Sequence, residues 1–578
     1  MFKLTNYLKL FKKQVILGPL FKLLEAIFEL IVPLVMAKII DVGIQNRDLN
    51  YILKMGGLLI LLGVVGLASA ITCQYFASVA SQGIGTHIRK DLFKHINSLS
   101  HSEIDNIGTP SLITRITNDV NQIQSAVAML IRLAVRAPFL IIGSTVMSMM
   151  INMKLSIIFI ATIFFIAFVL YMVMSKSIPF FTLIQKKLDK ISLITRESLE
   201  GARVVRAFSK EESEKKRFRE ASDELSSISI TVGKISALLN PLTSIIINFS
   251  IAILLWFGGF HVYSGNLTQG EVIAFVNYMT NILLVLIVVA NLIVIFSKAF
   301  ASIKRVNEIF EIKSTITENK QLTTTSNTSD SPKIEFKNVS FLYDNSNEKS
   351  LNNLSIKINR GEIIGIIGGT GSGKSTLVNL IPRFYDVSEG SILIDGIDVK
   401  DYALKDLRTQ IGVVPQKAVL FSGTIRENLY WGLENATDAE IKKSLEIAQA
   451  SEFVKKLPEG YETIISQGGK NLSGGQKQRL TIARALINNP EILILDDSAS
   501  ALDFATDAKL REAITTETKD TTIIIVSQRA STIRNADKII VLDGGDIQGI
   551  GNHEELMKTC EVYKEIYSSQ LSVKEVAI

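Results

Sequence analysis

Six long apolar segments in the first half of the chain place the strongest constraint on its fold. They lie near residues 15–43, 53–84, 129–152, 155–176, 240–264 and 271–297. Each reaches the roughly 20 residues that an α-helix needs to cross about 30 Å of hydrocarbon. A soluble all-helical domain does not account for so many segments of full length. The segments therefore predict an all-α membrane domain of six spans, embedded in a lipid bilayer.

The loops between these segments alternate in charge. Those near 41–52, 152–154 and 264–270 are short and carry few cations, whereas those near 85–128 and 177–239 are long and rich in Lys and Arg. Because cytoplasmic loops carry the excess of cations, both long loops and both termini are expected in the cytoplasm. The net charge of +6 is small, and its basic residues sit beside apolar runs, so no nucleic-acid partner is expected. We expect a multi-pass protein of the cell membrane, specifically a bacterial plasma membrane.

Both long loops also have the pattern of helices, so the spans are expected to continue as helices beyond the bilayer. Two short amphipathic stretches, 109–120 and 199–208, lie at the turning points of these loops. They would either dock on a soluble domain or form ordinary helix–turn–helix corners. The pattern alone leaves both interpretations open.

Charged residues occur inside two of the apolar segments. Glu25 and Glu29 are four apart and share one helix face, and Arg132 and Arg136 do the same in the third segment. Charges inside a membrane usually face a cavity or each other. They form either a polar wall of a transport path, or ion pairs, or a cytoplasmic extension outside the lipid, and the sequence does not choose between these.

The second half of the chain has a different composition. Residues 314–332 are polar and without apolar periodicity, which is typical of a linker. From residue 333 onward, short β-rich runs alternate with helices, which predicts an α/β domain with a largely parallel core sheet. The expected domains are therefore a membrane domain at 1–313, the linker, and a nucleotide-binding domain at 333–578.

A glycine-rich loop carries the strongest chemical signal. The sequence GGTGSGKST follows the strand EIIGII and opens a helix, in the pattern G-x-x-x-x-G-K-[ST] that cradles nucleotide phosphates. Lys374 is expected to reach the β- and γ-phosphates, and Ser375 to offer a hydroxyl to Mg²⁺. Asp496, at the end of the strand ILILD, and Gln416, after VVP, would complete the Mg²⁺ site. The expected loop residues for ATP are Gly368, Gly369, Thr370, Gly371, Ser372, Gly373, Lys374, Ser375 and Thr376.

A second anion-binding helix start lies further along the chain. The sequence NLSGGQKQRL places a Ser and two Gly ahead of a helix, and its contact residues would be Ser473, Gly474, Gly475 and Gln476. One chain does not need two phosphate cradles for one nucleotide. The second cradle makes sense if it serves a nucleotide that another chain holds.

In combination, these spans and motifs resemble a half-size ABC exporter of the multidrug or lipid type. The resemblance covers essentially the whole chain and implies a dimeric transporter ATPase that uses ATP and Mg²⁺ to move amphipathic drugs or lipids out of the cell. It also implies that Tyr343 stacks on adenine, that residues 473–476 contact the partner's ATP, and that residues 500–503 form the D-loop. The stretches 109–120 and 199–208 match the coupling helices of this family.

The chain departs from the family pattern at the positions that hydrolyse ATP. The general base, a Glu in the family, is Asp497, and the switch histidine is Gln528; the acidic residue before the signature is Gln467. Because Asp is one methylene shorter than Glu, its carboxylate would lie roughly 1–1.5 Å from the position at which a Glu would polarise the attacking water. A misplacement of about 1 Å can cost about 10²-fold in rate. Glutamine keeps hydrogen bonds but cannot switch charge as imidazole does. We therefore expect a site that binds ATP but hydrolyses it slowly.

A weak site beside an intact signature resembles the degenerate subunit of a heterodimeric exporter. A second homologous half-transporter, with Glu and His at these two positions, would then complete one competent site. A homodimer that hydrolyses slowly through Asp497 is the alternative assembly. The alternative function is an ATP-gated or regulatory membrane subunit with little hydrolysis of its own.

Overall fold

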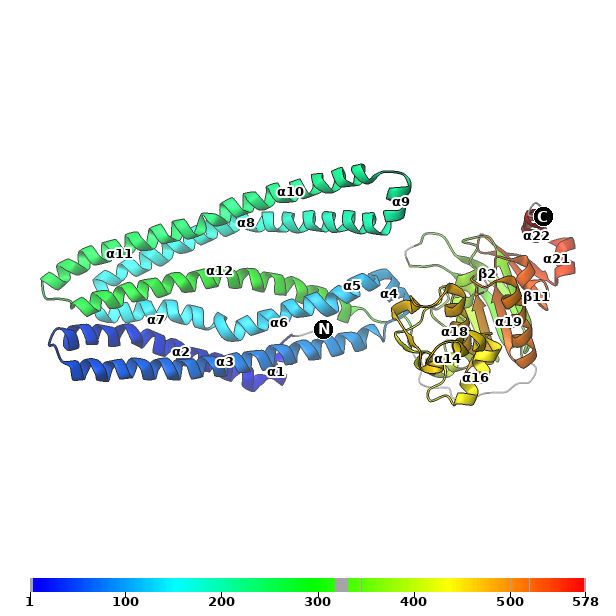
Figure 1. Cartoon of the computed structure of the whole chain (residues 1–578), viewed down its shortest axis with the longest axis horizontal. Coiled ribbons are helices and arrows are strands. Elements are labelled where there is room, and N and C mark those ends of the chain that lie inside the picture. Colours follow the sequence, from blue (N-terminus) through cyan, green and yellow to red (C-terminus); the bar gives the residue numbers. More distant parts are fainter. Residues whose placement is uncertain (1–3, 318–330, 345, 499–500, 519, 576–578) are drawn as a thin grey trace. The chain divides into compact units, whose positions relative to one another are not determined.

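The structure is a computed structural model that describes residues 4–317, 331–344, 346–498, 501–518 and 520–575 (Figure 1). It divides into two compact units. The helical unit comprises residues 1–97 and 110–312, and the sheet unit comprises residues 98–109 and 313–578.

The helical unit is built from long helices with three short π-helical turns. Its elements are α1 (Leu4–Leu10), α2 (Lys12–Lys38), η1 (Ile39–Ile44), α3 (Leu49–Ile96), α5 (Thr109–Thr114), η2 (Arg115–Asp119), α6 (Val120–Met129), η3 (Leu130–Ala134), α7 (Arg136–Ile151), α8 (Met153–Glu200), α9 (Ala202–Ala207), α10 (Glu211–Ala237), α11 (Leu239–Tyr263) and α12 (Gln269–Glu311).

Five helical stretches are long and apolar enough to cross a membrane. They are Leu49–Ile96, Thr109–Ile151, Met153–Glu200, Glu211–Tyr263 and Gln269–Glu311. The sixth predicted span corresponds to α2, an apolar helix of 27 residues that Lys22, Glu25 and Glu29 interrupt. The 48 residues of α3 extend over about 72 Å, more than twice the hydrocarbon thickness, so the spans do continue as helices beyond it.

The helices of this unit pack around α12. This helix contacts α2, α6, α7 and α11, and α8 runs beside α10 and α11 (Figure 1). At the centre, Phe159 of α8 lies against Phe275 of α12, with ring centroids 5.7 Å apart. Tyr278, fully buried on α12, donates a hydrogen bond to the Leu30 carbonyl of α2 (2.6 Å). The buried side of α12 therefore holds the unit together.

The sheet unit contains two larger sheets and one small one. The four-stranded antiparallel sheet has the order β2-β1-β4-β5, and the six-stranded sheet has the order β12-β11-β3-β10-β9-β6. The strands are β1 (Ile334–Phe341), β2 (Leu351–Ile358), β3 (Ile363–Gly368), β4 (Glu389–Ile394), β5 (Ile397–Asp398), β6 (Ile411–Val414), β7 (Gly423–Thr424), β8 (Ile464–Ile465), β9 (Ile492–Asp496), β10 (Thr522–Val526), β11 (Lys538–Asp543) and β12 (Asp546–Gly551). In the six-stranded sheet only the edge strand β12 is antiparallel to its neighbour.

Helices connect and cover these strands. They are α4 (His101–Ile107), α13 (Lys374–Leu380), α14 (Leu404–Thr409), α15 (Ile425–Tyr430), α16 (Asp438–Ile447), α17 (Ser451–Lys455), η4 (Gly460–Glu462), η5 (Gln467–Gly469), α18 (Gly474–Leu486), α19 (Phe504–Glu517), α20 (Ala530–Ile533), α21 (His553–Thr559) and α22 (Glu561–Glu575).

Strand β9 shows how the sequence sets the two hydrophobic cores of this unit. All five of its residues are buried, and successive side chains point to opposite faces of the sheet. Ile492 and Ile494 pack in the core shared with β1, β2, β4 and α13, and Leu493 and Leu495 pack in the core shared with α15, α16, α18 and α19. A strand covered on both faces needs a continuous apolar run, which is what the sequence ILIL supplies.

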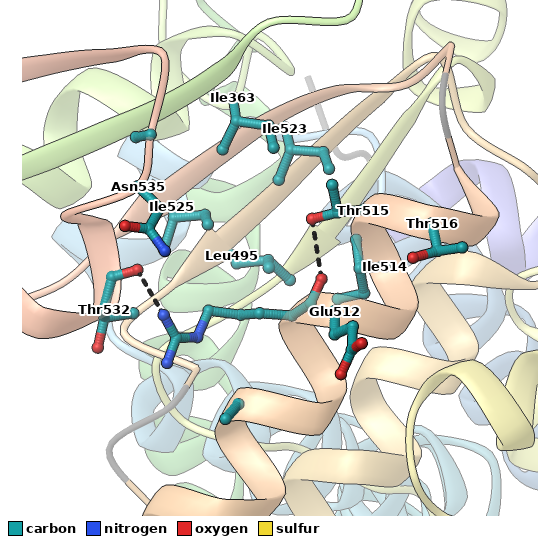
Figure 2. A pocket seen from close by; sticks show the side chains of 13 residues that line it. Ile363, Leu495, Glu512, Ile514, Thr515, Thr516, Ile523, Ile525, Thr532 and Asn535 are labelled. Atoms are coloured by element: carbon teal, nitrogen blue, oxygen red, sulfur yellow. Dashed lines mark hydrogen bonds between the residues drawn. The ribbon is translucent and has the colours of Figure 1, made fainter. Parts of the chain in front are cut away.

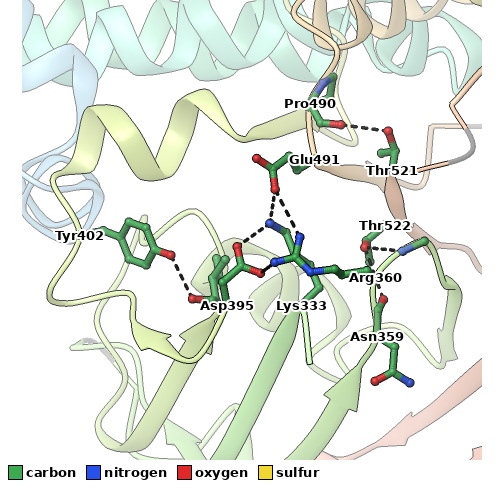
Figure 3. A network of polar contacts seen from close by, with 11 residues as sticks. Lys333, Asn359, Arg360, Asp395, Tyr402, Pro490, Glu491, Thr521 and Thr522 are labelled. Carbon is green, nitrogen blue, oxygen red and sulfur yellow. Dashed lines mark hydrogen bonds and ion pairs between the residues drawn. The ribbon is translucent and has the colours of Figure 1, made fainter. Parts of the chain in front are cut away.

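A buried lysine links the two larger sheets (Figure 3). Lys333, which is 1% exposed and directly precedes β1, lies 2.7 Å from an Asp395 carboxylate oxygen and also pairs with Glu491, which precedes β9. Arg360 makes a second ion pair with Asp395 at 2.5 Å. A buried cation is tolerated only where carboxylates neutralise it, as they do here.

We expect Lys333→Met to destabilise the sheet unit by about 2 kcal/mol, less than a fully buried pair costs, because Arg360 remains beside Asp395. For a domain of this size, that loss lowers the unfolding midpoint by about 4–8 °C. Thermal unfolding of the full chain in detergent measures it. The matched control is Arg360→Met, whose half-exposed ion pairs contribute below about 1 kcal/mol. An equal or larger shift for the control would contradict the role given to Lys333.

A segment of the first long loop belongs to the sheet unit. It comprises residues 98–109 and contains α4. The sequence pattern left open whether 109–120 docks on a soluble domain or forms a corner, and the family resemblance matched it to a coupling helix. The structure places 110–120 in the helical unit, so the segment that packs within this chain's sheet unit ends where that stretch begins. The other predicted stretch, 199–208, contains α9 and lies in the helical unit.

Side-chain hydrogen bonds fix α4 to the sheet unit. The Tyr385 hydroxyl donates to Asp105 (2.7 Å), and Ser102 donates to Asp344. Glu103 closes a capping box at the start of α4 and accepts a hydrogen bond from the Thr315 amide (3.1 Å). Burial acts to raise the pKa of Glu103, but these hydrogen bonds outweigh it and hold that pKa below the usual value.

Candidate nucleotide site

Four loops converge at one edge of the six-stranded sheet. Parallel strands β3, β10, β9 and β6 are consecutive neighbours, so their carboxyl ends meet at the same edge. The register places Val526 opposite Ile366 on one side and opposite Asp496 on the other. The next residues of these strands carry the glycine-rich loop, Gln528, Asp497 and, after β6, Gln416. Ligands of parallel α/β sheets bind beyond this edge.

The glycine-rich loop has the backbone that its sequence predicts. Gly371 and Gly373 have φ angles of 82° and 95°, in the left-handed region that favours glycine. A Cβ atom on Gly373 would lie 2.6 Å from the Ser350 carbonyl oxygen. Only glycine fits at this position, directly before α13, whose N-terminal amides and dipole favour a phosphate.

Lys374 holds its ammonium over this loop. The side chain is 8% exposed, and Nζ donates to the carbonyls of Gly369 (2.5 Å) and Gly368 (3.1 Å) and to the Ser372 hydroxyl (3.3 Å). Burial lowers the pKa of Lys374, and the nearby carboxylates of Asp496 and Asp497 oppose that shift. The cation is thus placed inside the phosphate loop, where phosphate oxygens would meet it.

The residues expected at the metal lie beside each other. The Ser375 hydroxyl donates to an Asp496 carboxylate oxygen (3.2 Å), and burial raises the pKa of Asp496. Within the described ranges, no three or more His, Cys, Asp or Glu side chains group as a metal site. Mg²⁺ in nucleotide sites takes one or two carboxylates together with phosphate oxygens, so a hydroxyl, an amide and one carboxylate fit that role.

Asp497 has an unusual backbone and a defined partner. Its φ angle is 45°, and its amide donates to the Val526 carbonyl (3.0 Å). Burial raises the pKa of Asp497, whereas a hydrogen bond from Gln416 and the cations Arg529 and Lys374 lower it. The Asp497 carboxylate is therefore hydrogen-bonded to Gln416, another of the predicted site residues.

Gln528 contributes no charge to this edge. Its side chain is exposed and forms no hydrogen bond with other residues that the structure describes; only its carbonyl is bound, by Gln570 Nε2 (2.7 Å). The structure therefore brings Gln528 to the predicted place by sheet register, without an interaction that would fix its amide.

Tyr343 is held beside the phosphate loop. Its hydroxyl lies 3.2 Å from the Thr376 hydroxyl, and its ring packs edge-on against Phe341 (4.7 Å) and Tyr385 (5.4 Å). The aromatic partners were not predicted. Their signal is weak, because Tyr385 follows α13 in the sequence RFYD, about forty residues from Tyr343.

The second predicted cradle lies at the start of α18. Ser473 and Gln476 close a capping box, with the Gln476 amide 3.3 Å from the Ser473 hydroxyl. Among the described residues, no hydrogen bond joins 473–476 to the glycine-rich loop. Of the predicted D-loop, Ser500 lies outside the described residues, and Asp503 caps α19 by accepting from the Thr506 amide (2.9 Å).

A cavity of about 430 Å³ between α19 and the sheet is separate from this site (Figure 2). Ile363, Ile514 and Ile523 form its apolar wall. Arg511 also lines it and donates to the Thr532 carbonyl (3.0 Å). None of the predicted nucleotide residues lines it, so it has no part in the site described above.

A phosphate loop at the edge of a parallel sheet, in a chain with long apolar helices, defines a membrane-bound P-loop nucleotide hydrolase. Two family models match the chain: the ABC transporter transmembrane region over residues 15–288, and the ABC transporter domain over residues 351–500. The chain belongs to the ABC transporters.

Individual relatives agree with this family over nearly the full length. The uncharacterized ABC transporter ATP-binding protein YfiB of Bacillus subtilis (strain 168) is 40% identical over 98% of each chain. An ATP-dependent lipid A-core flippase of Desulfotalea psychrophila is 35% identical over 86% of this chain and 87% of its own. A bacterial Atm1-family ABC exporter, solved with ATP bound, shares the fold with a TM-score of 0.81 at 24% identity, over 97% and 99% of the two chains.

The predicted half-size exporter is thereby confirmed. The protein is a multi-pass, ATP-driven ABC exporter with a helical membrane domain fused to an α/β domain that binds and hydrolyses ATP. Exporters of this family work as dimers in the lipid bilayer. The roles of the individual site residues, the weakness of Asp497 and Gln528, and the identity of the second chain stay predictions.

Proposed function

We propose that this chain is the degenerate-site subunit of a heterodimeric exporter. It holds ATP and Mg²⁺ at its own phosphate loop, turns them over slowly, and completes a competent site on its partner. One observation carries the proposal: the groups that hold phosphate are assembled, while the two positions for water activation and charge switching are Asp497 and Gln528.

The geometry of Asp497 supports a weak base. Its short carboxylate accepts a hydrogen bond from Gln416, a residue also expected at the metal. A base must reach the attacking water within hydrogen-bond distance. A carboxylate one methylene short of the family's Glu, and held toward Gln416, is poorly placed to do so.

Mg²⁺ would be held by Ser375, Gln416 and Asp496, and it would neutralise charge on the β- and γ-phosphates. Ser375 and Asp496 supply oxygen ligands, and Lys374 supplies a cation for the phosphates from within the loop. Tyr343, fixed by Thr376, offers a ring for the adenine. These groups retain ATP whether or not hydrolysis follows.

The signature loop is proposed to act on the partner's nucleotide. Its helix start carries the amides of Gly474 and Gly475 in the first turn, where an α-helix leaves N–H groups without an intrahelical partner, and among the described residues it has no hydrogen bond to this chain's phosphate loop. A head-to-tail dimer would place residues 473–476 over the ATP that the partner holds.

We expect Ser473→Ala to lower hydrolysis of the partner's ATP by about 10-fold, because a group contacting that γ-phosphate is lost together with the helix cap. ATP bound at this chain's own loop should be unchanged. Nucleotide trapping with photo-crosslinkable radiolabelled ATP separates the two subunits. Ser466→Ala, which removes a hydroxyl from the preceding loop, is the matched control. Equal loss of labelling in both subunits would contradict the crossed arrangement.

The cargo is proposed to be an amphipathic small molecule, a drug or a lipid, moved out of the cell. A relative named as a lipid A-core flippase supports the lipid class. The cation-rich long loops support a cytoplasmic location for both termini, in a bacterial plasma membrane.

Co-purification tests the assembly directly. The tagged chain, isolated from its native membrane, should carry a homologous second chain in a one-to-one ratio. Recovery of this chain alone as an active dimer would overturn the heterodimer and favour slow hydrolysis through Asp497. The alternative function, an ATP-gated or regulatory subunit, predicts no uphill transport of dye into inverted vesicles that contain both chains.

A further inference from the structure

A cluster of charges crosses from α2 to α7 inside the helical unit. Arg136 pairs with Glu29 (2.6 Å), and Lys22 pairs with Glu25 (2.6 Å). Arg132 makes no ion pair with any residue that the structure describes. Lys22, Arg132 and Arg136 thus outnumber the two carboxylates by one, and of these charges Glu29 and Arg136 line the cavity described below.

The cluster lies at membrane depth. Counted from the ends of α2, α12 and α7 at the short loops, Glu29, Asn281 and Arg136 lie about 14, 18 and 22 Å along their helices. These depths fall within a hydrocarbon layer about 30 Å thick. Ionisable groups at such depth are rare, pair with one another or face a cavity, and commonly mark ligand or ion paths.

A cavity of about 130 Å³ opens beside the Glu29–Arg136 pair. Its wall also includes Asn281, Leu140 and Leu284. The volume is several times what one water molecule needs, so a carboxylate or phosphate group fits. The apolar residues offer a surface for the first carbons of an attached chain.

Donors around this cavity lack acceptors. Arg136 Nε is buried and makes no hydrogen bond in the described part of the chain, and the Asn281 amide makes none either. A buried N–H without an acceptor costs about 1–3 kcal/mol, more when charged. Guanidinium and amide donors together match an oxyanion, which guanidinium binds through two N–H groups.

A polar face of α12 continues from the cavity. Asn277, Asn281, Leu284 and Asn291 are spaced by four, three and seven residues and lie on one side of the helix. Asn277, Leu284 and Asn291 are exposed in the chain. The Asn277 amide donates to the Ile273 carbonyl of its own helix (3.0 Å), whereas Asn281 and Asn291 add further amides to this face, so the face suits a polar path better than lipid.

We propose that this cavity binds the anionic head of an amphipathic substrate, a carboxylate or a phosphate. Arg136 is the main donor and Asn281 the second. Glu29 holds the guanidinium until the anion arrives and competes with it. The inference rests on the proposed export of amphipathic molecules and names their class.

The test is equilibrium binding of 11-(dansylamino)undecanoate to the assembled exporter in nanodiscs, without nucleotide. Arg136→Gln should weaken binding about 10- to 100-fold, because a charge-assisted hydrogen bond is lost. Glu29→Gln should tighten it several-fold, because the guanidinium loses its competitor. Lys54→Gln, at an exposed cation of α3, is the matched control and should change nothing.

The sign of the Glu29→Gln effect separates a binding site from a structural ion pair. The proposal would be overturned if Arg136→Gln and Glu29→Gln weakened probe binding alike. It would also be overturned if the cation dodecyltrimethylammonium displaced the probe as well as the anionic compounds do. Dodecyl phosphate and dodecanoate are then compared as competitors of the bound probe. If dodecyl phosphate displaces the probe more strongly, the site prefers a phosphate head, and if dodecanoate does, it prefers a carboxylate. If neither displaces the probe, the proposal is overturned. Binding is measured without nucleotide, so it does not depend on transport. If the variants change binding as expected but the exporter does not move the probe when ATP is supplied, the transport proposal is wrong and the binding site remains supported.

Discussion

Replacing Asp497 by Asn is expected to lower the ATPase rate of the assembled exporter by only a few-fold. Little chemistry runs through a short carboxylate that Gln416 already holds. The matching Glu→Gln change in the partner should lower the rate by about 10²–10⁴-fold, since that is the usual contribution of one general base. Steady-state phosphate release from the reconstituted complex measures both variants.

Lys374→Ala supplies the control for this comparison. It removes the cation from the loop and should release ATP from this chain's own site, which labelled nucleotide reports. If Asp497→Asn stopped turnover as completely as the partner's change, Asp497 would be a true catalytic base. The degenerate-site proposal would then be wrong.

The double change Asp497→Glu with Gln528→His is expected to create a second fast site. Glu recovers the missing methylene and His recovers a group that can change charge, and together they should raise hydrolysis at this site by about 10²-fold or more. Sheet register supports the repair, because residues 497 and 528 follow adjacent parallel strands whose ends lie opposite each other. Single-turnover hydrolysis at this chain's loop, with the partner's site blocked by its Glu→Gln change, measures the gain.

The two single changes are the controls. Asp497→Glu alone should raise the hydrolysis rate at this site only slightly, because Gln528 remains neutral. Gln528→His alone should also raise it only slightly, because the Asp497 carboxylate remains one methylene short. Asp tolerates the left-handed backbone at position 497 better than Glu does, so the double variant should lose about 1 kcal/mol of stability. Full activity from either single change would contradict the view that both groups are needed.

The grouping of the candidate nucleotide residues at one sheet edge was predictable, because each of them lies in a short stretch of sequence with a clear local signal. A phosphate loop needs glycine where φ is positive, and Gly371 and Gly373 stand at those positions in the sequence itself. Asp496 and Asp497 end an apolar run that only a doubly covered strand would carry. Parallel pairing then brings these strand ends together, so the same pattern predicted the fold class and the place of the candidate site.

Features that depend on tertiary distance were beyond the sequence. Glu25 and Glu29 share a helix face, yet one pairs within α2 and the other with Arg136 of α7, and helical spacing contains no information about the neighbour. Similarly, the amphipathic pattern left open whether 109–120 docks on a soluble domain, whereas in the structure the contact through Asp105 belongs to the preceding segment. The two stretches are both short and polar on one side, so only packing distinguishes them.

The grouping of α4 with the sheet unit has a mechanical consequence. The chain passes between the two units three times, at 97–98, 109–110 and 312–313. A domain connected by one segment of chain can rotate about that segment. A domain connected by three segments transmits its rotation to all three. Any turn of the sheet unit is therefore passed through covalent connections to the ends of α3, α5 and α12 at the same time.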